Sequence, residues 1–382
     1  MNILWVPHTG WHIPQRAHLF CRALSERHTV HVTDWIADFT SLQDYLSQRY
    51  VRNFFYRKYK DGEITVHGIP RISPALFFSR LRQLNRMIFS YWVTKIIAAY
   101  DIDVVVGTFV VPPPDASRLI FDLFDDNEAY WHSFGKVPGY VQDILDAERA
   151  YLEKADAVVA ASEVLRDKAR ERGAQGPIFL IPNGFDMSLA QSVNPTEIRR
   201  RFAPTGKLVG LVGNHDKQEE IAKVLSAARN FQSEEVTFLI VGRGKVIPWA
   251  MKVVLEEELS NVLFHGYVSP QEGLNFAAAL DVGLCPYIKT PGLEASSPMR
   301  LIMYSSIGLP TVCTDFEAVR RLGFPNLVLV KDDVDSLVAG IRKALALPKT
   351  MPEGIEEFDL TALVEKYESV LSGGENHMVI GQ

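Results

Sequence analysis

Short apolar runs rich in β-branched residues alternate with helix-like stretches along nearly the whole chain. This alternation is typical of parallel sheets built from strand–helix–strand units. In the first half we expect strands at residues 2–7, 29–33, 103–107, 119–123, 157–161 and 178–181, and helices at 14–26 and 139–154. After a polar break at 194–206 we expect strands at 208–212, 237–241, 262–265, 282–286, 311–314 and 327–330. The pattern predicts two doubly wound α/β domains, whose ligands bind beyond the carboxyl ends of the strands, by default in the cleft between the domains.

The composition narrows the class of protein. A length of 382 residues has room for two sizeable cores, and 47% hydrophobic with 23% charged residues is typical of an ordered globular chain. With 40 Lys and Arg against 46 Asp and Glu, the net charge of −6 excludes a generally basic nucleic-acid binder. Cys21, Cys285 and Cys313 are too widely spaced for a disulfide framework or a metal cluster, which fits a reducing cytoplasm.

The charge is unevenly distributed. Residues 49–100 contain ten cations and two acids, a local net charge of +8 that leaves −14 on the rest of the chain. Cations alternate with aromatic residues in this segment, as suits a surface that meets anionic lipid, at about 1 kcal/mol per Lys or Arg. The candidates for contact with a membrane or acceptor are Arg52, Phe54, Phe55, Arg57, Lys58 and Lys60. The alternative is that the aromatics belong to the core and the cations are merely solvated.

The helix that follows this segment extends the prediction. Its apolar stripe is expected to consist of Phe77, Leu81, Leu84 and Ile88. Arg82 and Arg86 would then point away from the stripe and reach outward, towards the same surface.

A second candidate site lies at residues 296–311. Ser297 is a good N-cap, Pro298 a good first helical residue, and Gly308 a good helix end before a new strand. The free amides at the start of such a helix suit a diphosphate, and Arg300 would add a fixed cation. The alternative is an ordinary αβ unit with well-formed caps.

Several short motifs occur in a specific order. Residues 148–162 read ERAYLEKADAVVAAS, residues 181–186 read IPNGFD, and the later pieces are GLVGN at 210–214, FLIVGRG at 238–244, VLFHG at 262–266 and ALDVGLCP at 279–286. In this order and spacing the chain resembles a GT-B glycosyltransferase of the retaining family 4 type (group 1). The resemblance implies two Rossmann-like domains that face a central cleft: 1–186 on the acceptor side and 187–351 for the nucleotide sugar. It further implies a C-terminal helix at 352–372 that packs back on the first domain, followed by a flexible tail at 373–382.

The resemblance also implies donor-binding residues. Gly10 follows the first strand, where a glycine lets the backbone approach a diphosphate, although an ordinary turn would also use one. Gly213 and Asn214 occupy the place of the family's Gly-Arg pair, so Lys217 is the remaining cation there. The donor-binding candidates are Gly10, Gly213, Asn214, Lys217, Arg243, Ser296, Ser297, Arg300 and Met303.

One departure concerns the family's paired glutamates. Alignment places Ala295 at the first glutamate and Met303 at the second, and a methionine cannot accept the hydrogen bonds of ribose hydroxyls. Glu294 is adjacent and could substitute for the first. The other catalytic candidates are Asp125 and Asp126, which could orient an acceptor hydroxyl or offset positive charge on the donor sugar, although Asp126 could instead cap a helix.

The resemblance therefore implies a retaining, metal-independent, hexosyltransferase-like enzyme of surface glycan biosynthesis. It would move a sugar from a nucleotide diphosphate sugar to a lipid-linked or polysaccharide acceptor, with no cofactor and no nucleic-acid partner. We expect it in the cytoplasm, peripheral at the inner face of the cell membrane, with an anionic lipid surface as a further partner. Ala295 and Met303 motivate an alternative, a catalytically silent scaffold in a glycan assembly complex. A nucleotide-sugar epimerase is a third reading, supported only by the scaffold.

Overall fold

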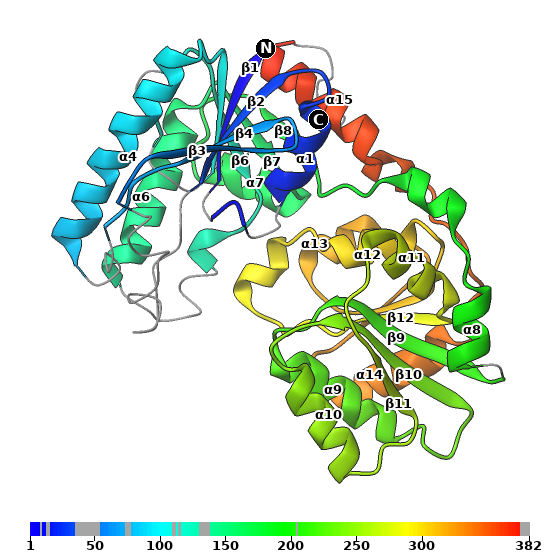
Figure 1. The fold of residues 1–382 in the computed structure, drawn as a ribbon. Helices are drawn as coiled ribbons and strands as arrows, with labels where there is room; N and C mark the ends of the chain where they lie inside the picture. Colours follow the sequence, from blue (N-terminus) through cyan, green and yellow to red (C-terminus); the bar gives the residue numbers. More distant parts are fainter. Residues whose placement is uncertain are drawn as a thin grey trace. The chain divides into compact units, whose positions relative to one another are not determined.

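The computed structural model describes residues 1–7, 10–12, 16–34, 54–72, 78–108, 112–113, 116–129, 138–203 and 205–374. The chain divides into two compact units (Figure 1). The first unit comprises Met1–Pro182 with Thr361–Gln382, and the second comprises Asn183–Leu360. The divisions thus fall at residues 182 and 360, where the sequence placed them at 186 and 351.

The first unit is built on an eight-stranded sheet of order β3-β4-β2-β1-β5-β6-β7-β8. Its strands are β1 (Asn2–Val6), β2 (Thr29–Asp34), β3 (Arg57–Asp61), β4 (Ile64–Gly68), β5 (Val104–Gly107), β6 (Leu119–Leu123), β7 (Ala157–Ala160) and β8 (Ile178–Leu180). Its helices are α1 (Arg16–Leu24), α4 (Ser79–Ala99), α6 (Pro138–Lys154), α7 (Glu163–Glu171) and α15 (Leu360–Ser372). All neighbouring strands are parallel except β3, which is antiparallel to β4.

Helices cover both faces of this sheet. On one face Trp5 of β1 packs against Phe20 of α1 and Tyr367 of α15, with ring centroids 6.4 and 5.3 Å away. On the other face Phe121 of β6 stacks on Tyr151 of α6 at 4.9 Å. The α6 helix approaches so closely that a Cβ at Gly107 would lie 2.0 Å from the Tyr151 hydroxyl, so only glycine fits there. Helix α4 lies beside α6 (Figure 1), and the two are joined by an ion pair between Arg82 and Asp143.

Three elements of the first unit differ from the prediction. Strands β3 and β4 were not predicted: β3, Arg57-Lys58-Tyr59-Lys60-Asp61, lacks apolar alternation and is an exposed edge strand, whereas β4 is short and buried. The predicted stripe on α4 is wrong as well: Leu84 is 40% exposed, and the buried residues are Asn85, Phe89, Val93, Ile96 and Ile97. Phe77 lies outside the described residues.

The predicted outward reach of two arginines is also wrong. The Arg82 Nε donates to an Asp143 carboxylate oxygen at 2.6 Å, and Arg86 forms an ion pair with the same carboxylate. Because Asp143 belongs to α6, both cations stabilise the contact between the two helices. They are therefore not available to an external partner in the way the sequence predicted.

The second unit is built on a six-stranded parallel sheet of order β11-β10-β9-β12-β13-β14. Its strands are β9 (Lys207–Asn214), β10 (Val236–Arg243), β11 (Val262–His265), β12 (Val282–Cys285), β13 (Thr311–Thr314) and β14 (Leu327–Val330), which confirms the six predicted strands. Its helices are α8 (Thr196–Phe202), α9 (Gln218–Arg229), α10 (Ile247–Glu256), α11 (Pro270–Ala279), α12 (Met299–Ser305), α13 (Glu317–Leu322) and α14 (Val334–Ala344). Short 3₁₀ helices are η1 (Met187–Ser192), η2 (Pro291–Ala295) and η3 (Ile355–Phe358).

The strand order of the second unit defines where a ligand would bind. From β9 the chain builds outward to β10 and β11, then returns to the other side of β9 for β12, β13 and β14. In open parallel sheets this reversal opens a crevice beyond the carboxyl ends of the two strands concerned, here β9 and β12. Buried Tyr304 of α12 fixes the edge, because its hydroxyl accepts a hydrogen bond from the Val212 amide at 2.9 Å.

In the parts of the chain that the structure describes, none of the helices is both long enough and apolar enough for a bilayer crossing.

Candidate functional site

Near the carboxyl ends of β9 and β10, two paired residues are glycines and carry no side chain. Gly213 pairs with Gly242, and Asn214 pairs with Arg243. The two glycines adopt φ values of +143° and +125°. A Cβ at Gly242 would lie 1.8 Å from the Gly213 carbonyl oxygen, so a side chain cannot be placed there. The backbone of Gly213 and Gly242 is therefore bare near the carboxyl end of β9, beside the crevice that the strand order opens.

Arg300 of α12 lies against this bare edge. Its Nη2 donates to the Asn214 carbonyl oxygen at 3.2 Å, and its guanidinium carbon lies 5.9 Å from the centre of the Tyr287 ring. Its Nη1 is buried and has no hydrogen-bond partner among the described residues. Because a guanidinium is always charged and an unpaired buried donor is costly, this atom indicates a place for an anionic acceptor from outside the chain.

Two further cations lie near the same strand ends. Lys217, directly before α9, has a side chain that is 59% exposed and lies 3.8 Å from a carboxylate oxygen of Glu220. Burial raises the pKa of Glu220, against the opposing effect of the cations Lys217 and Arg300. Arg243 lies over the ring of Tyr267, which is 66% exposed, at 4.7 Å. Lys217, Arg243 and Arg300 thus surround the edge with positive charge.

His215 supports this edge without adding charge. Its Nε2 lies 2.9 Å from the Val241 carbonyl oxygen, and its amide donates to the Arg243 carbonyl at 2.9 Å. Burial, assisted by the cation of Arg300, lowers the pKa of His215 to about 4. The imidazole is therefore neutral near pH 7 and ties β9 to β10. His215 was not predicted from the sequence, although its position directly after Gly213-Asn214 was an available signal.

Ser297 does not cap α12 as the sequence predicted. The N-cap residue is Pro298, and the helix begins at Met299. Instead, the Ser297 hydroxyl accepts the Asn183 amide at 3.2 Å, and its carbonyl accepts the Asn183 side chain at 2.7 Å. Ser296 donates to the Gly292 carbonyl at 3.4 Å. Both serines therefore have structural partners within the second unit.

Ala295 and Met303 occupy the two positions where the family resemblance leads us to expect glutamates. Ala295 is fully buried and Met303 is half-buried. A carboxylate oxygen of Glu294 accepts the Glu317 amide at 2.6 Å at the start of α13, and the other lies 3.2 Å from Lys289. Glu294 is thus engaged in holding α13 and Lys289, a role that the sequence did not predict for it.

Asp126 is engaged by neighbouring groups of the first unit. It is buried, forms ion pairs with Lys168 and with Arg172 (2.7 Å), and accepts the Ala129 amide at 3.3 Å. Burial raises its pKa, but hydrogen bonds from Lys168 and Arg172 outweigh burial and hold the pKa below the ordinary value. This placement favours the capping alternative over contact with an acceptor. Asp125, directly before it, is half-buried and stays a prediction.

The turn after β1 is anchored by carboxylates. Gly10 is buried, and the Trp11 amide donates to Asp34 at 2.9 Å. The Trp11 indole donates to Asp61 at 2.8 Å. These bonds hold the chain around Gly10 against β2 and β3, and they were not visible in the sequence because β3 was not predicted.

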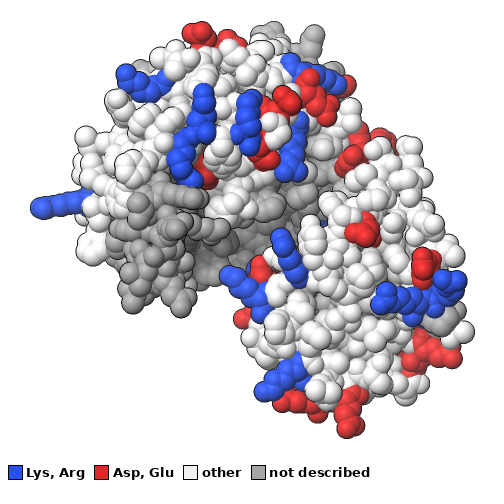
Figure 2. Space-filling view, in the orientation of Figure 1, with Lys and Arg blue, Asp and Glu red and all other residues white. Residues whose placement is uncertain are grey.

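The basic segment contains exposed apolar side chains. Phe55 is 65% exposed and Phe54 is also exposed, so the alternative that both belong to the core is wrong. Arg57, Lys58 and Lys60 lie on β3, and Lys58 donates to the Tyr100 hydroxyl at 3.1 Å. Arg52 lies outside the described residues. Figure 2 shows Lys and Arg side chains scattered among acidic and neutral ones on both units in this view.

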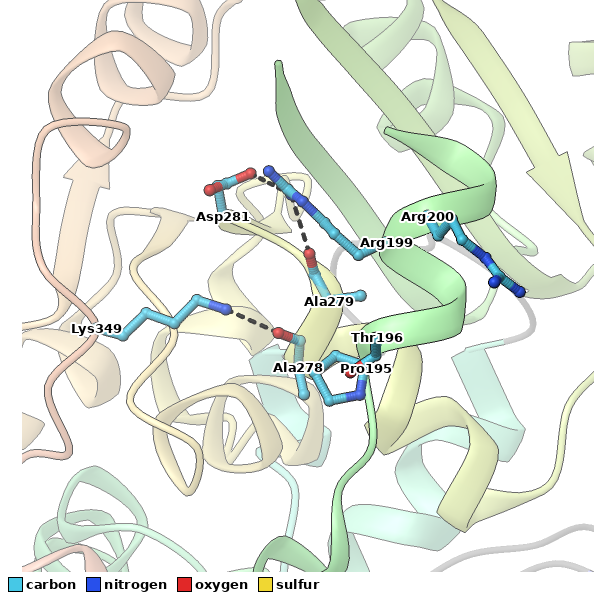
Figure 3. A pocket seen from close by; sticks show the side chains of 8 residues that line it. All are labelled: Pro195, Thr196, Arg199, Arg200, Ala278, Ala279, Asp281 and Lys349. Atoms are coloured by element: carbon cyan, nitrogen blue, oxygen red, sulfur yellow. Dashed lines mark hydrogen bonds and ion pairs between the residues drawn. The ribbon is translucent and has the colours of Figure 1, made fainter. Parts of the chain in front are cut away.

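A separate cavity of about 600 Å³ lies at the opposite end of the second unit's sheet (Figure 3). Arg199 forms an ion pair with Asp281, which precedes β12 and accepts the Leu208 amide at 2.7 Å. Lys349 donates to the Ala278 carbonyl at 2.7 Å, and Arg200 points away from Asp281 in Figure 3. The polar groups of this cavity mostly satisfy one another, so it differs from the Arg300 edge.

Comparisons with known proteins agree with this geometry. The family model described as Glycosyltransferase Family 4 matches residues 13–189, and the one described as Glycosyl transferases group 1 matches residues 206–346. Escherichia coli WcaI, named as a glycosyl transferase of colanic acid biosynthesis, is 28% identical over 217 residues, which cover 53% of this chain and 52% of WcaI. The chain spans about half the length of the curated relatives it matches.

Solved structures match over almost the full length. Sucrose-phosphate synthase from Thermosynechococcus elongatus has a TM-score of 0.70 and 15% identity, with 97% of this chain and 98% of that chain covered. Anabaena HepE, solved in complex with UDP and glucose, has a TM-score of 0.66 and 15% identity, with coverages of 98% and 100%.

Two doubly wound units, with a glycine-lined cationic edge on the second, define a protein of the GT-B class. Since family models match both halves of the chain, it belongs to the group 1, family 4-like glycosyltransferases.

Proposed function

We propose that the protein transfers a hexose from a nucleoside diphosphate sugar to a lipid-linked or polysaccharide acceptor in surface glycan biosynthesis. The observation that carries the proposal is the buried Nη1 of Arg300, which lacks a partner among the described residues and lies beside the bare backbone of Gly213 and Gly242. A diphosphate would supply the missing acceptor. The UDP bound by HepE and the polysaccharide pathways named for the curated relatives support the same assignment.

The cations would act on the leaving group. Negative charge builds up on the diphosphate as the bond to the sugar breaks, and fixed donors aimed at that charge stabilise the transition state. Arg300 would provide a half-buried charge, while Lys217 and Arg243 would provide exposed ones. With these cations in place the transfer is proposed to need no metal ion, and retention of configuration follows the family resemblance.

A nucleotide screen tests the donor site. UDP, GDP and ADP are each titrated into the purified chain while its thermal stability is followed. A nucleotide at 100 times its dissociation constant should stabilise the protein by about 2.7 kcal/mol. Arg300→Met is the matched variant, and it should abolish most of the shift. If none of the nucleotides or their sugar conjugates stabilises the wild type, the donor site is not there.

A second candidate function is a catalytically silent scaffold. It is favoured by Ala295 and Met303 at the expected glutamate positions, and by the engagement of Glu294 with Glu317 and Lys289. Both functions allow nucleotide binding, so the discriminating measurement is turnover. Release of nucleoside diphosphate from a bound donor sugar, with acceptor lipids or with water, supports the enzyme, whereas tight binding without any release supports the scaffold.

We further propose a peripheral position at the cytoplasmic face of the membrane. Helix α4 exposes Leu84, Met87 and Tyr91, and Lys95 lies 5.7 Å from the Tyr91 ring. The neighbouring β3 segment adds exposed Phe54 and Phe55 beside its cations, and Tyr56 stacks on Trp92 of α4 at 4.2 Å. Apolar side chains rimmed by cations fit an anionic leaflet.

Vesicle sedimentation tests this position. Binding should be stronger to vesicles with anionic lipid than to neutral ones, and it should fall when Lys58 and Lys60 are both changed to Glu, at about 1 kcal/mol for each lost cation. Lys343→Glu, an exposed lysine of the second unit, is the control. Equal binding to both vesicle types, or an equal loss in the control, contradicts the proposal.

A further inference from the structure

Two cysteines lie side by side beneath the Arg300 edge. Cys285 ends β12, Cys313 lies on β13, and the two are register partners of adjacent parallel strands. Neighbouring strands are about 4.8 Å apart, within the Cα separations of about 4.4–6.8 Å that disulfides use. Register partners project to the same face of the sheet, and each thiol shifts the pKa of the other. The backbone therefore already holds them in a geometry that a disulfide can adopt.

The two thiols have unequal surroundings. Burial raises the pKa of Cys285, but its interaction with Cys313 and the cation of Arg300 outweigh burial, so the net shift is downward. Burial and the sulfur of Cys285 raise the pKa of Cys313 well above its ordinary value. Cys285 is thus the better nucleophile of the pair, and Cys313 keeps its proton until its own sulfur attacks the oxidised Cys285. Cys21, in the first unit, is buried as well and serves as an internal control.

We propose that Cys285 and Cys313 are a thiol modification site, which a small hydroperoxide converts into a disulfide that weakens diphosphate binding at Arg300. The part concerning the disulfide stands on the strand register alone. The part concerning the diphosphate rests on the proposed function.

The chemistry balances without a further reactant. The Cys285 thiolate attacks one oxygen of hydrogen peroxide, the O–O bond breaks, and the departing oxygen leaves as water after protonation. The Cys285 sulfenic acid is then attacked by the Cys313 sulfur, the S–O bond breaks, and the hydroxyl leaves with the Cys313 proton as a second water. The two thiols lose two electrons and the peroxide gains them. Both thiols are fully buried, so only a small oxidant, entering on local opening at the strand ends, reaches them.

A short path connects this disulfide to the cation. The amide of Tyr287 donates to the Cys285 carbonyl at 2.9 Å, and Thr314, next to Cys313, donates to the Tyr287 carbonyl at 2.6 Å. The Tyr287 ring in turn lies beneath the Arg300 guanidinium. A disulfide draws the two Cβ atoms to about 3.8 Å, so these bonds transmit the shift to the ring and move the guanidinium. A displacement approaching 1 Å in a charged site costs binding, and we expect about a tenfold loss.

The first experiment maps the bond. The folded full chain is treated with hydrogen peroxide, remaining thiols are blocked, and a non-reducing digest is analysed by mass spectrometry. We expect one linked peptide pair, Cys285 with Cys313, that dithiothreitol reverses, and the same pair in Cys21→Ala. The proposal is overturned if Cys285 and Cys313 both stay free under conditions that fully oxidise exposed thiols. It is also overturned if the linked pair forms only in denaturant.

Cys313→Ala is the matched variant and should form no linked pair. If that variant does not fold, phenylarsine oxide replaces it, because the reagent bridges two adjacent thiols in the wild type. One equivalent should bind per folded chain, and prior oxidation should prevent this. Failure to bind the folded, reduced chain counts against the pair.

The second experiment measures the consequence. Affinities for UDP and for inorganic pyrophosphate are compared in the reduced and the oxidised chain. A roughly tenfold loss on oxidation, restored by dithiothreitol and absent in Cys313→Ala, is expected. An unchanged affinity in a fully linked chain overturns the regulatory part. Absence of binding in the reduced chain instead contradicts the proposed function, and the peptide map still decides the disulfide.

Discussion

Arg16 in the first unit and Arg300 in the second are both placed close to carboxyl ends of sheet strands, but their hydrogen bonding differs. The Arg16 Nε lies 3.1 and 3.2 Å from the two oxygens of buried Asp122. Its Nη1 and Nη2 donate to the carbonyls of Pro182 and Ile181 at 2.9 and 2.6 Å. Arg300 donates from Nη2 to the Asn214 carbonyl, and its Nη1 has no acceptor within the described part of the chain.

The difference separates an arginine that holds the fold from one that, under the proposed function, binds a ligand. A guanidinium whose donors all meet acceptors of the chain is already neutralised and gains nothing from an added anion. A guanidinium that keeps an unpaired buried donor pays a desolvation cost which a bound diphosphate would remove. Charge alone does not distinguish the two residues, whereas burial and the count of satisfied donors do, because Arg16 is buried and Arg300 is half-buried.

The largest effect is expected from Arg16→Met. It leaves the Asp122 carboxylate buried without its counter-ion, so the first unit should lose about 3–5 kcal/mol of stability. Guanidinium unfolding followed by tryptophan fluorescence reports on this unit, because Trp249 is the single tryptophan of the second. Arg22→Met, an exposed change on the same helix, should cost under about 0.5 kcal/mol. Equal losses in both variants would remove the distinction drawn for Arg16.

Acidification should destabilise both units. His215, and the hydrogen-bonded pair His31 and His67 in the first unit, have pKa values lowered to about 4, chiefly by burial. The unfolded chain binds these protons near pH 6.5, so stability falls as the pH drops from about 6.5 to about 4, by up to about 3 kcal/mol for His215. In wild type, protection of the β9 and β10 amides from hydrogen exchange should fall as the pH drops over this range. In His215→Gln this pH dependence should be weaker for β9 and β10, and the pH dependence for β2 and β4 should be the same as in wild type.

Arg300→Met should affect binding more than stability. Losing this half-buried charge should weaken nucleoside diphosphate binding by about 2 kcal/mol, or roughly thirtyfold, because hydrogen bonds to charged groups are worth about 1.5–3 kcal/mol. Stability should change by less than about 1 kcal/mol, since one donor is already unpaired. Calorimetry measures the first and denaturant unfolding the second, with exposed Arg200→Met as the control. A large loss of stability with unchanged affinity would make Arg300 a second Arg16.

The smallest effect is expected from Lys217→Met. An exposed cation near the same edge contributes through water, so the affinity should fall by about 0.5 kcal/mol, roughly twofold. The difference from wild type should shrink as salt is raised, because exposed charges are screened. Lys252→Met, on α10, is the control and should leave the affinity unchanged. An effect as large as that of Arg300→Met would mean that Lys217 closes over the ligand.

Much of the fold could be predicted because parallel strands buried on both faces read as apolar runs. β6, β11, β13 and β14 have the predicted limits. β3 could not be predicted, since its polar sequence becomes a strand only by pairing with β4. The prediction of the apolar stripe on α4 was wrong for a related reason, because the buried face of this helix includes the polar residue Asn85. The Asn85 side-chain amide accepts a hydrogen bond from the Ile72 amide and donates one to the Ile72 carbonyl, both at 2.8 Å.

The structure brings some of the predicted candidate residues together at one strand edge, but their individual contacts were not predicted. A glycine near a strand end and a cation in the first turn of a helix are visible in the sequence, so Gly213 and Arg300 were named as candidates. The partners of Asp126 could not, because Lys168 and Arg172 are about 40 residues further along the chain. The engagement of Glu294 with the α13 amide likewise depends on packing that no local pattern encodes.

The second unit is one continuous stretch of chain, and backbone hydrogen bonds join its two ends. The Phe185 amide donates to the Phe358 carbonyl at 2.9 Å, and the Leu360 amide donates to the Phe185 carbonyl at 3.0 Å. Because the segments where the chain enters and leaves this unit lie side by side, the whole unit can be replaced by joining a new one at two neighbouring points. Residues 183–360 thus form a transplantable cassette, so that grafting the same stretch from a relative with another donor preference offers a direct route to hybrid sugar-transferring proteins.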